Sequence, residues 1–360
     1  MRAITAATCT SRPPSEPAVS VRIGVIGCGV MGATHVRLLA TEVRGAEVAA
    51  VADADPVRAA AVAGGARVHE DPLALVADAE VDAVIIASSD ATHEAFVLAC
   101  LEAGKPVLCE KPLAATAEAG LRVVEAEAAI GRRLVQLGFM RRYDSGYVAM
   151  KAALRDGAVG APLLLHCIHR NASVPPDYTS DMLITSTAIH EVDIARWLLE
   201  DEIVSAVVHG PRSPRSPGGL RDPQLVVLET AGGVLVDVEV FATARYGYDI
   251  RCELVGEAGT VTLAPPRTVE VRRDGQDGAM VPEGFAPRFA EAYRRELQAW
   301  TVAAGGGGAT GPSAWDGYAA SAVGEACLRS LAEGGGSHAV ELAEQPGLYT
   351  AEGLGASSGV

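Results

Sequence analysis

The sequence contains no run of five or more basic residues, and its formal net charge is −15. A negative field of this size repels nucleic acid and anionic membranes, so we expect neither as a partner. No apolar run reaches the roughly 18 residues that a membrane-spanning helix needs. Residues 1–20 lack the apolar core and small-residue cleavage site of a secretory signal. We expect a cytoplasmic protein whose first 20 residues form a poorly ordered tail.

Cysteine is scarce and irregularly spaced. The seven cysteines are odd in number, and no two of them stand in a CxxC pair. This spacing excludes zinc-finger motifs and argues against a disulfide framework in a chain of 360 residues. Most of the cysteines lie within apolar runs, which favours buried thiols. We predict no metal site.

The first part of the sequence alternates short apolar runs with helical patterns. The apolar runs cover residues 21–26, 47–52, 81–87, 107–109 and 134–137, and the predicted helices between them cover 30–39, 56–63, 94–103 and 117–130. Strands that alternate with helices of this length form parallel, doubly wound sheets. We therefore predict an α/β dinucleotide-binding Rossmann domain over residues 21–140.

After residue 140 the pattern changes. Helices are predicted at 144–155, 187–199, 289–302 and 315–331, and strands at 163–169, 203–209, 225–229, 234–241, 250–255, 261–263 and 269–272. Turns rich in Gly and Pro separate many of them, and residues 212–222 form a Pro/Gly-rich loop. Residues 141–350 are thus predicted to form an α+β domain with an open, mostly antiparallel sheet.

A glycine-rich motif follows the first predicted strand. Gly27-Cys28-Gly29-Val30-Met31-Gly32 matches GxGxxG at the point where a strand passes into a helix. The first glycine permits the tight turn, the second lets the backbone approach a pyrophosphate, and the third allows close packing of helix on strand. The helix N-terminus supplies N–H donors for the phosphates. The motif predicts a bound dinucleotide.

The cofactor is predicted to be NAD because Asp53 closes the second strand, 26 residues after Gly27. A carboxylate there can accept hydrogen bonds from the adenosine ribose and repels a 2′-phosphate. Arg58 is nearby but is expected on the following helix. The alternative is that Asp53 is a helix-capping or turn aspartate.

A lysine is predicted at the carboxyl end of the fourth strand, in Cys109-Glu110-Lys111-Pro112. Ligands of doubly wound sheets bind at this end of the strands, so Lys111 is directed at the cofactor cleft. Its ammonium can bond a substrate oxygen and stabilise alkoxide character as hydride leaves.

At this point the chain resembles the glucose–fructose oxidoreductase/inositol dehydrogenase/rhizopine-catabolism superfamily. The resemblance covers Val21 to about Tyr349. It is carried by the EKP string above and by Gln136-Leu137-Gly138-Phe139-Met140-Arg141-Arg142-Tyr143-Asp144, His169-Arg170-Asn171, Ile189-His190-Glu191-Val192-Asp193, Tyr246-Gly247-Tyr248-Asp249-Ile250 and Trp315-Asp316-Gly317-Tyr318.

The resemblance implies that the second domain covers the nicotinamide with one face of its sheet and supports a homotetramer. It implies Lys111 and His190 as the catalytic pair. The predicted substrate-binding residues are Arg141, Asn171, Ser186, Asp193 and Tyr246. The predicted cofactor-binding residues are Gly27, Gly29, Val30, Met31, Gly32, Asp53, Ser88, His93, Glu110 and Lys111.

Alcohol oxidation needs a base for the hydroxyl proton, and a histidine suits that task. His190 and Asp193 are three residues apart on a predicted helix and are expected to share a face. The family pattern places an aspartate four residues before the histidine, whereas this chain has Ser186. The serine either leaves His190 without a carboxylate neighbour, makes room for a different ring substituent, or caps the helix.

The expected function is reversible NAD-dependent oxidation of a secondary ring hydroxyl of a cyclitol, with myo-inositol as the leading substrate. One alternative is a dehydrogenase or ketoreductase of the same fold acting on an aminocyclitol, sugar or nucleotide sugar. Two further alternatives are a glycoside hydrolase that uses NAD transiently and a non-catalytic NAD-binding sensor.

Overall fold

The structure is a computed structural model that describes residues 20–211, 219–264 and 270–350. The tail predicted at 1–20 lies outside this range except for residue 20, and so does most of the loop predicted at 212–222. In the part of the chain that is described, no helix is long and apolar enough to cross a membrane.

The first domain contains a six-stranded parallel sheet in the order β3-β2-β1-β4-β5-β6. Its strands are β1 (Val21–Ile26), β2 (Ala46–Ala52), β3 (Arg67–His69), β4 (Ala83–Ile86), β5 (Val107–Cys109) and β6 (Val135–Leu137). The central strands are buried, as expected for a sheet covered on both faces. This confirms the Rossmann prediction.

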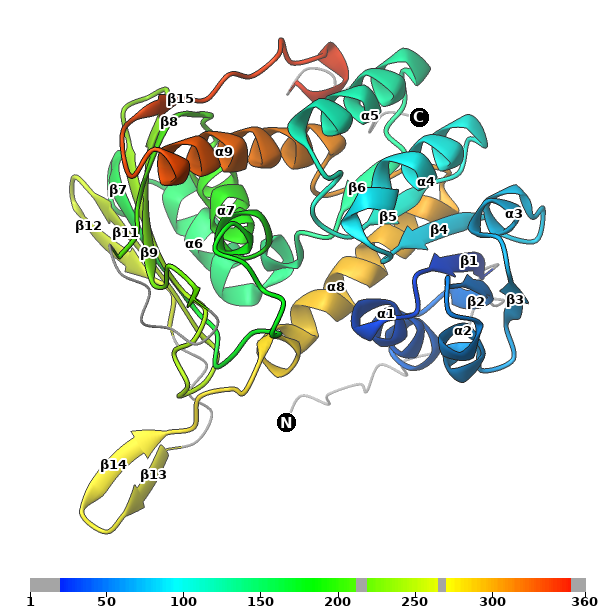
Figure 1. The fold of residues 1–360 in the computed structure, drawn as a ribbon, viewed down its shortest axis with the longest axis horizontal. Helices are drawn as coiled ribbons and strands as arrows, with labels where there is room; N and C mark the ends of the chain where they lie inside the picture. Colours follow the sequence, from blue (N-terminus) through cyan, green and yellow to red (C-terminus); the bar gives the residue numbers. More distant parts are fainter. Residues whose placement is uncertain (1–19, 212–218, 265–269, 351–360) are drawn as a thin grey trace, which may run out of the picture.

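Helices connect these strands (Figure 1). They are α1 (Val30–Thr41), α2 (Pro56–Val62), α3 (Pro72–Ala77), α4 (Asp90–Glu102) and α5 (Ala117–Ile130). Asp55, Asp71 and Thr116 cap α2, α3 and α5 by accepting backbone N–H bonds. The sequence analysis missed β3 and α3, because β3 is a short edge strand with mostly exposed side chains and no apolar run.

The second domain contains a seven-stranded open sheet in the order β12-β11-β7-β10-β9-β8-β15. Its strands are β7 (Pro162–Arg170), β8 (Ile203–His209), β9 (Gln224–Thr230), β10 (Leu235–Phe241), β11 (Asp249–Gly256), β12 (Gly259–Thr262) and β15 (His338–Ala339). All described pairings are antiparallel except that of β7 with β10. The prediction of an open, mostly antiparallel sheet is confirmed.

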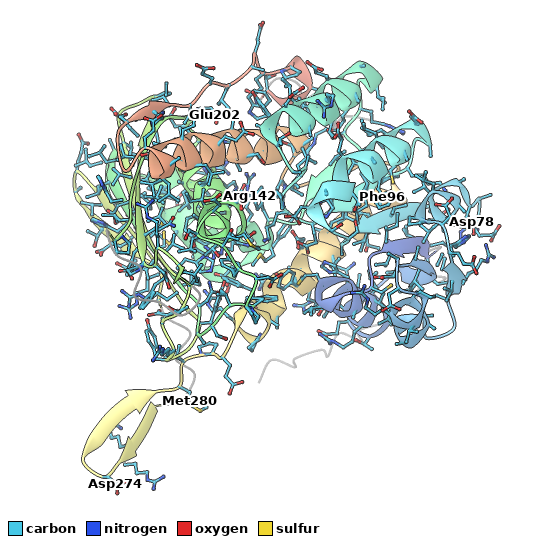
Figure 2. All side chains as sticks on the ribbon, in the orientation of Figure 1. Asp78, Phe96, Arg142, Glu202, Asp274 and Met280 are labelled. Atoms are coloured by element: carbon cyan, nitrogen blue, oxygen red, sulfur yellow. The ribbon has the colours of Figure 1, made fainter. Side chains whose placement is uncertain are left out.

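The strand predicted at 269–272 does not join this sheet. Residue 269 lies outside the described residues, and among the strands that the structure describes β13 (Glu270–Arg273) pairs with β14 (Gln276–Ala279) alone. The resulting hairpin projects from the body of the molecule, with Asp274 at its tip and the exposed Met280 at its base (Figures 1 and 2).

The helical elements of the second part are η1 (Met140–Tyr143), α6 (Ser145–Arg155), η2 (Leu183–Ala188), α7 (Ile189–Leu199), α8 (Phe285–Gly305), α9 (Ala314–Ala332) and η4 (Gly347–Tyr349). The π-helical segment η2 runs directly into α7. Helix α8 runs from beside the second sheet back to the first domain (Figure 1). There it packs on α1 and β1, and Gln298 accepts the Arg44 N–H at 2.9 Å. Helix α8 thereby links the second domain to the first.

Candidate active site

The glycine motif forms the turn between β1 and α1. Gly27 has φ +90°, and a Cβ on it would lie 2.4 Å from the backbone oxygen of Ala87. A Cβ on Gly32 would lie 1.8 Å from the Gly27 oxygen, so only glycine fits at either position. A Cβ on Gly29, in contrast, would meet no atom of the described residues within 4 Å. The backbone is therefore open to a ligand at the start of α1, where Val30 is 77% exposed.

A cavity of about 580 Å³ lies beside this turn, and Gly27, Gly29, Asp53 and Ser88 of the predicted cofactor set line it. The carboxylate of Asp53 accepts the Cys28 N–H at 2.6 Å and the Asp55 N–H at 2.8 Å. Asp53 thus fixes the backbone at the end of β2 while facing the cavity.

Arg58 also lines this cavity. The residue lies on α2, as predicted, but its guanidinium reaches back to within 3.4 Å of Asp53 and 3.3 Å of Asp55. The Arg58 guanidinium therefore lies beside the Asp53 carboxylate, a neighbour that the sequence did not predict.

His93 lies behind the wall of the cleft. It is buried, with Nδ1 2.7 Å from the Pro112 oxygen and Nε2 3.2 Å from the Ser88 oxygen. These contacts hold the backbone that follows Lys111 against the start of α4. The structure thus gives His93 a supporting position, whereas we predicted that it binds the cofactor.

A second cavity, of about 340 Å³, brings Lys111 and His190 together. Lys111 enters from the end of β5, His190 from α7 and Asn171 from the end of β7. The full lining is Met31, Glu110, Lys111, Met140, His169, Asn171, Ser173, Val174, Pro175, Tyr178, Ser186, Thr187, His190, Tyr248, Phe285 and Tyr293.

Lys111 reaches across the cleft, and its Nζ donates to the backbone oxygen of Ser186 at 3.1 Å. Burial lowers the pKa of Lys111, while the negative charge of Glu110 opposes that shift. Glu110 is itself held by His35, whose Nε2 lies 2.7 Å from Oε1.

The His190 imidazole is 8% exposed. Burial, followed by the positive charges of Arg141 and Lys111, holds its pKa well below the ordinary histidine value. The ring is therefore neutral at physiological pH, which is the state in which a histidine accepts a proton.

Arg141 lies behind the cavity wall, not in it. Its guanidinium pairs with Glu191 and lies 3.1 Å from His169 Nδ1, and all three side chains are buried. Arg141 is not among the residues that line the cavity, so the polyol contact expected of it stays a prediction. A buried guanidinium requires a carboxylate partner, and Glu191, 50 residues further along the chain, supplies it.

Asp193 also turns away from the cavity. Its carboxylate accepts three bonds from Arg142, the shortest at 2.6 Å, and Arg142 also lies 2.8 Å from Asp316. Figure 2 shows Arg142 in the second domain between α7 and α9. Asp193 is not among the residues that line the cavity, because its carboxylate is held by the partly buried Arg142, so the predicted contact between Asp193 and the substrate stays a prediction.

Tyr246 is 47% exposed, donates to Asp249 at 2.6 Å and accepts from Arg170 at 3.0 Å. Tyr248 lines the cavity in its place. The two tyrosines would share a face in a regular strand. Gly247, with φ +142°, breaks that alternation before β11 begins. Tyr246 is not among the residues that line the cavity, and its substrate contact stays a prediction.

Ser186 lies inside the π-helix η2 and lines the cavity. The N-cap of α7 is Ala188, so the helix-cap interpretation of Ser186 is wrong. π-helices are rare, and their single turns are frequently found at functional sites. Here the wider turn presents both the Ser186 side chain and its backbone oxygen to the cleft.

Several cavity residues were missed by the sequence analysis. His169 and Tyr248 stand within the strings quoted for the resemblance and had a signal there. Phe285 and Tyr293 come from α8, far along the chain, and only tertiary packing brings them to the cavity. Within the described ranges, no group of three or more His, Cys, Asp or Glu residues is placed to hold a metal ion.

A glycine turn on a parallel sheet, a strand-end lysine and a neutral histidine in one cleft define a dinucleotide-dependent oxidoreductase. Sequence comparison agrees. Residues 21–139 match the model of the Gfo/Idh/MocA oxidoreductase family, NAD-binding Rossmann fold, and residues 151–342 match that family's C-terminal alpha/beta domain. The chain belongs to this family, and its dinucleotide is NAD.

Several relatives are similar over nearly the whole chain. Inositol 2-dehydrogenase 1 of Saccharopolyspora erythraea is 59% identical over 336 residues, which cover 92% of this chain and 99% of that protein. Inositol 2-dehydrogenase of Paracoccus denitrificans is 49% identical over 336 residues, 92% of this chain and 100% of that one.

A solved structure is also similar. The crystal structure of myo-inositol dehydrogenase from Lactobacillus casei, in complex with NAD(H) and myo-inositol, has a TM-score of 0.89 at 37% identity. The match covers 92% of this chain and 100% of that one.

Proposed function

We propose that the chain catalyses the reversible, NAD-dependent oxidation of a secondary ring hydroxyl of a cyclitol to the ketone, with myo-inositol as the leading substrate. The observation that carries the proposal is the single cavity that holds both Lys111 and His190 at the carboxyl ends of the first sheet's strands. The inositol dehydrogenases that resemble the chain at up to 59% identity support the same substrate class.

The residues of the first domain fit NAD. The free space beside the Gly29 backbone has room for a pyrophosphate. The first turn of α1 is accessible to the same group, because Val30 at its start is exposed. Asp53 faces the same cavity with its carboxylate fixed by two backbone N–H groups. When bound, NAD accepts the hydride that leaves the substrate carbon.

Lys111 and His190 divide the remaining chemistry. His190, neutral because burial and neighbouring cations lower its pKa, takes the hydroxyl proton. The Lys111 ammonium donates a hydrogen bond to the same oxygen and stabilises its developing negative charge. The side chains of Asn171 and Ser186, which line the cavity with them, are placed to bond other hydroxyls of the ring.

Arg141 and Asp193 act through other residues. Arg141 holds His169 and Glu191 in place behind His190, and Asp193 ties α7 to Arg142. They are positioning residues for the helix that carries His190.

The test is a screen of inositol isomers, aminocyclitols, hexoses and nucleotide sugars with NAD, followed by NADH formation. NADH with myo-inositol as the best substrate supports the proposal. A better rate with an aminocyclitol or sugar reassigns the substrate. Cleavage of a glycoside without NADH accumulation indicates a hydrolase, and NAD binding with no turnover indicates a sensor.

We further propose that the protein works in the cytoplasm as a homotetramer without nucleic acid. A net charge of −15 disfavours nucleic acid, and an NAD-linked enzyme depends on the intracellular cofactor pool. We take the outer face of the second sheet as the assembly surface. It carries the apolar residues Ile168, Leu225, Val227 and Leu235, and the register pairs them with Glu229, Asp237 and Glu239, so the face is mixed apolar and acidic. Sedimentation equilibrium measures the number of subunits.

A further inference from the structure

A buried histidine outside the predicted site contacts its machinery. His35 lies on α1 and is fully buried, with Nε2 2.7 Å from Glu110 Oε1. Its other ring nitrogen, Nδ1, has no hydrogen-bond partner among the described residues. The ring packs edge-on against Tyr293 of α8, with centroids 6.1 Å apart. The histidine therefore links the helix that begins at the pyrophosphate turn to the strand end that carries Lys111.

The Glu110 carboxylate is held on several sides. Oε1 accepts from His35, and Oε2 accepts the Lys111 N–H at 3.3 Å. A Cβ on Gly138 would lie 2.9 Å from Oε2, so the backbone after β6 packs directly against the carboxylate. His35 supplies the shorter of the two hydrogen bonds, and the carboxylate has little room to move while that bond is present.

Glu110 supplies the main negative charge near the Lys111 ammonium. Asp90, at the start of α4, also raises the pKa of Lys111, whereas the positive charge of Arg141 lowers it. His169 and His190 face the lysine from β7 and α7.

Burial alone would raise the pKa of Glu110, but the hydrogen bond from His35, the charge interaction with the same ring and then the charge of Lys111 lower it below its ordinary value. Tyr293 and Glu296 of α8 also face this carboxylate. Removal of the His35 donor would leave a buried carboxylate on one weak bond, and burial would then favour its protonated form.

We propose that His35 is a positioning residue for the reaction: its ring N–H holds Glu110 as a carboxylate beside Lys111 and so keeps Lys111 an ammonium. The inference rests on the catalytic role proposed for Lys111. The His35 ring lines neither of the two cavities, so we infer that it acts only through Glu110.

Trace acetylation with acetic anhydride, followed by mass spectrometry of the Lys111 peptide across a pH series, measures the pKa of this amine without turnover. In His35→Leu we expect that pKa to fall by about one pH unit. The alkaline limb of kcat/KM should move by the same amount, because activity is lost as pH rises through the Lys111 pKa. His35→Gln, which keeps an N–H donor near the Nε2 position, should restore both.

The Glu110→Gln background shows whether His35 acts through Glu110. There His35→Leu should produce no further shift, because the charge that it controls is already gone. An unshifted Lys111 pKa in His35→Leu, or an equal shift in both backgrounds, would overturn the inference, even if His35→Leu melts at a lower temperature. If His35→Leu does not fold, His35→Asn takes its place, since its shorter amide cannot reach Glu110.

The two proposals fail separately. If the wild-type protein forms no NADH from any cyclitol, the proposed function is contradicted. The acetylation series still measures whether His35 controls the charge of Lys111.

Discussion

The ammonium of Lys111 donates to the backbone oxygen of Ser186 at 3.1 Å, and this contact joins the strand end of the first sheet to the π-helix of the second domain. Because the acceptor is a backbone atom, a substitution at position 186 changes the side chain in the cavity without removing the acceptor. Position 186 is therefore suited to testing how charge near His190 affects the reaction.

Ser186→Asp should move the acid limb of the kcat/KM profile to higher pH. His190 must be neutral to accept a proton, so activity is lost as pH falls through its pKa, which lies well below the ordinary value in the wild type. A carboxylate in the same cavity favours the imidazolium and raises that pKa. Activity on myo-inositol should also rise. Ser186→Asn is the uncharged control.

Two other outcomes at position 186 are informative. Loss of activity on the true substrate, with none gained on myo-inositol, would mean that Ser186 makes room for a different ring substituent. An unchanged pH profile together with unchanged substrate preference contradicts our interpretation of this residue.

Lys111→Met should lower kcat by on the order of 10²-fold or more, because the variant cannot stabilise negative charge on the oxygen. The Kd for NAD should change little, since Gly27, Gly29 and Asp53 line a separate part of the cleft. Steady-state kinetics and a fluorescence titration with NADH measure the two quantities. Lys111→Arg, which keeps a cation, should show a smaller fall in kcat. Near-normal turnover of Lys111→Met would mean that the lysine has no part in the mechanism.

Asp53→Ser should narrow the preference for NAD over NADP, because a 2′-phosphate is no longer repelled. Arg58, 3.4 Å from Asp53 in the wild type, is then released to bind that phosphate. The double variant Asp53→Ser, Arg58→Ala should not show the rise in kcat/KM with NADP that Asp53→Ser shows. The measurement is kcat/KM with each cofactor. A wild-type kcat/KM that is higher with NADP than with NAD contradicts the account.

Asp193→Ala should destabilise the protein by roughly 1–3 kcal/mol, because the partly buried Arg142 loses the Asp193 carboxylate but keeps Asp316 as a partner. Urea unfolding measures this free energy. If Asp193 only ties α7 to Arg142, the KM for myo-inositol in the folded fraction should change less than kcat. A large rise in KM with an unchanged free energy of unfolding would instead indicate that Asp193 contacts the substrate.

The parts of the site that could be predicted from the sequence follow local rules. Gly27, Asp53 and Lys111 were placed by the order of strands and turns, since ligands bind at the carboxyl ends of parallel strands. The orientation of Asp193 depends instead on Arg142, 51 residues earlier in the chain. Helical spacing indicates which face a residue lies on, but a buried partner of opposite charge decides where a carboxylate points.

The same limit applies to the second domain. Strand alternation predicted β8 at Ile203–His209 correctly, because a half-buried strand has a period of two. It could not predict that Tyr248 and not Tyr246 faces the cavity, since Gly247 changes the backbone direction between them.

The central claim is that hydride passes from a cyclitol ring carbon to NAD under the control of Lys111 and His190. The most direct measurement uses myo-inositol deuterated at ring carbon 2, with mass spectrometry of the NADH formed by the wild type, Lys111→Met and His190→Ala. The account predicts deuterated NADH and a primary isotope effect on the wild-type rate, with both variants slower by about 10² or more. Unlabelled NADH, or variants that turn over as fast as the wild type, would contradict it.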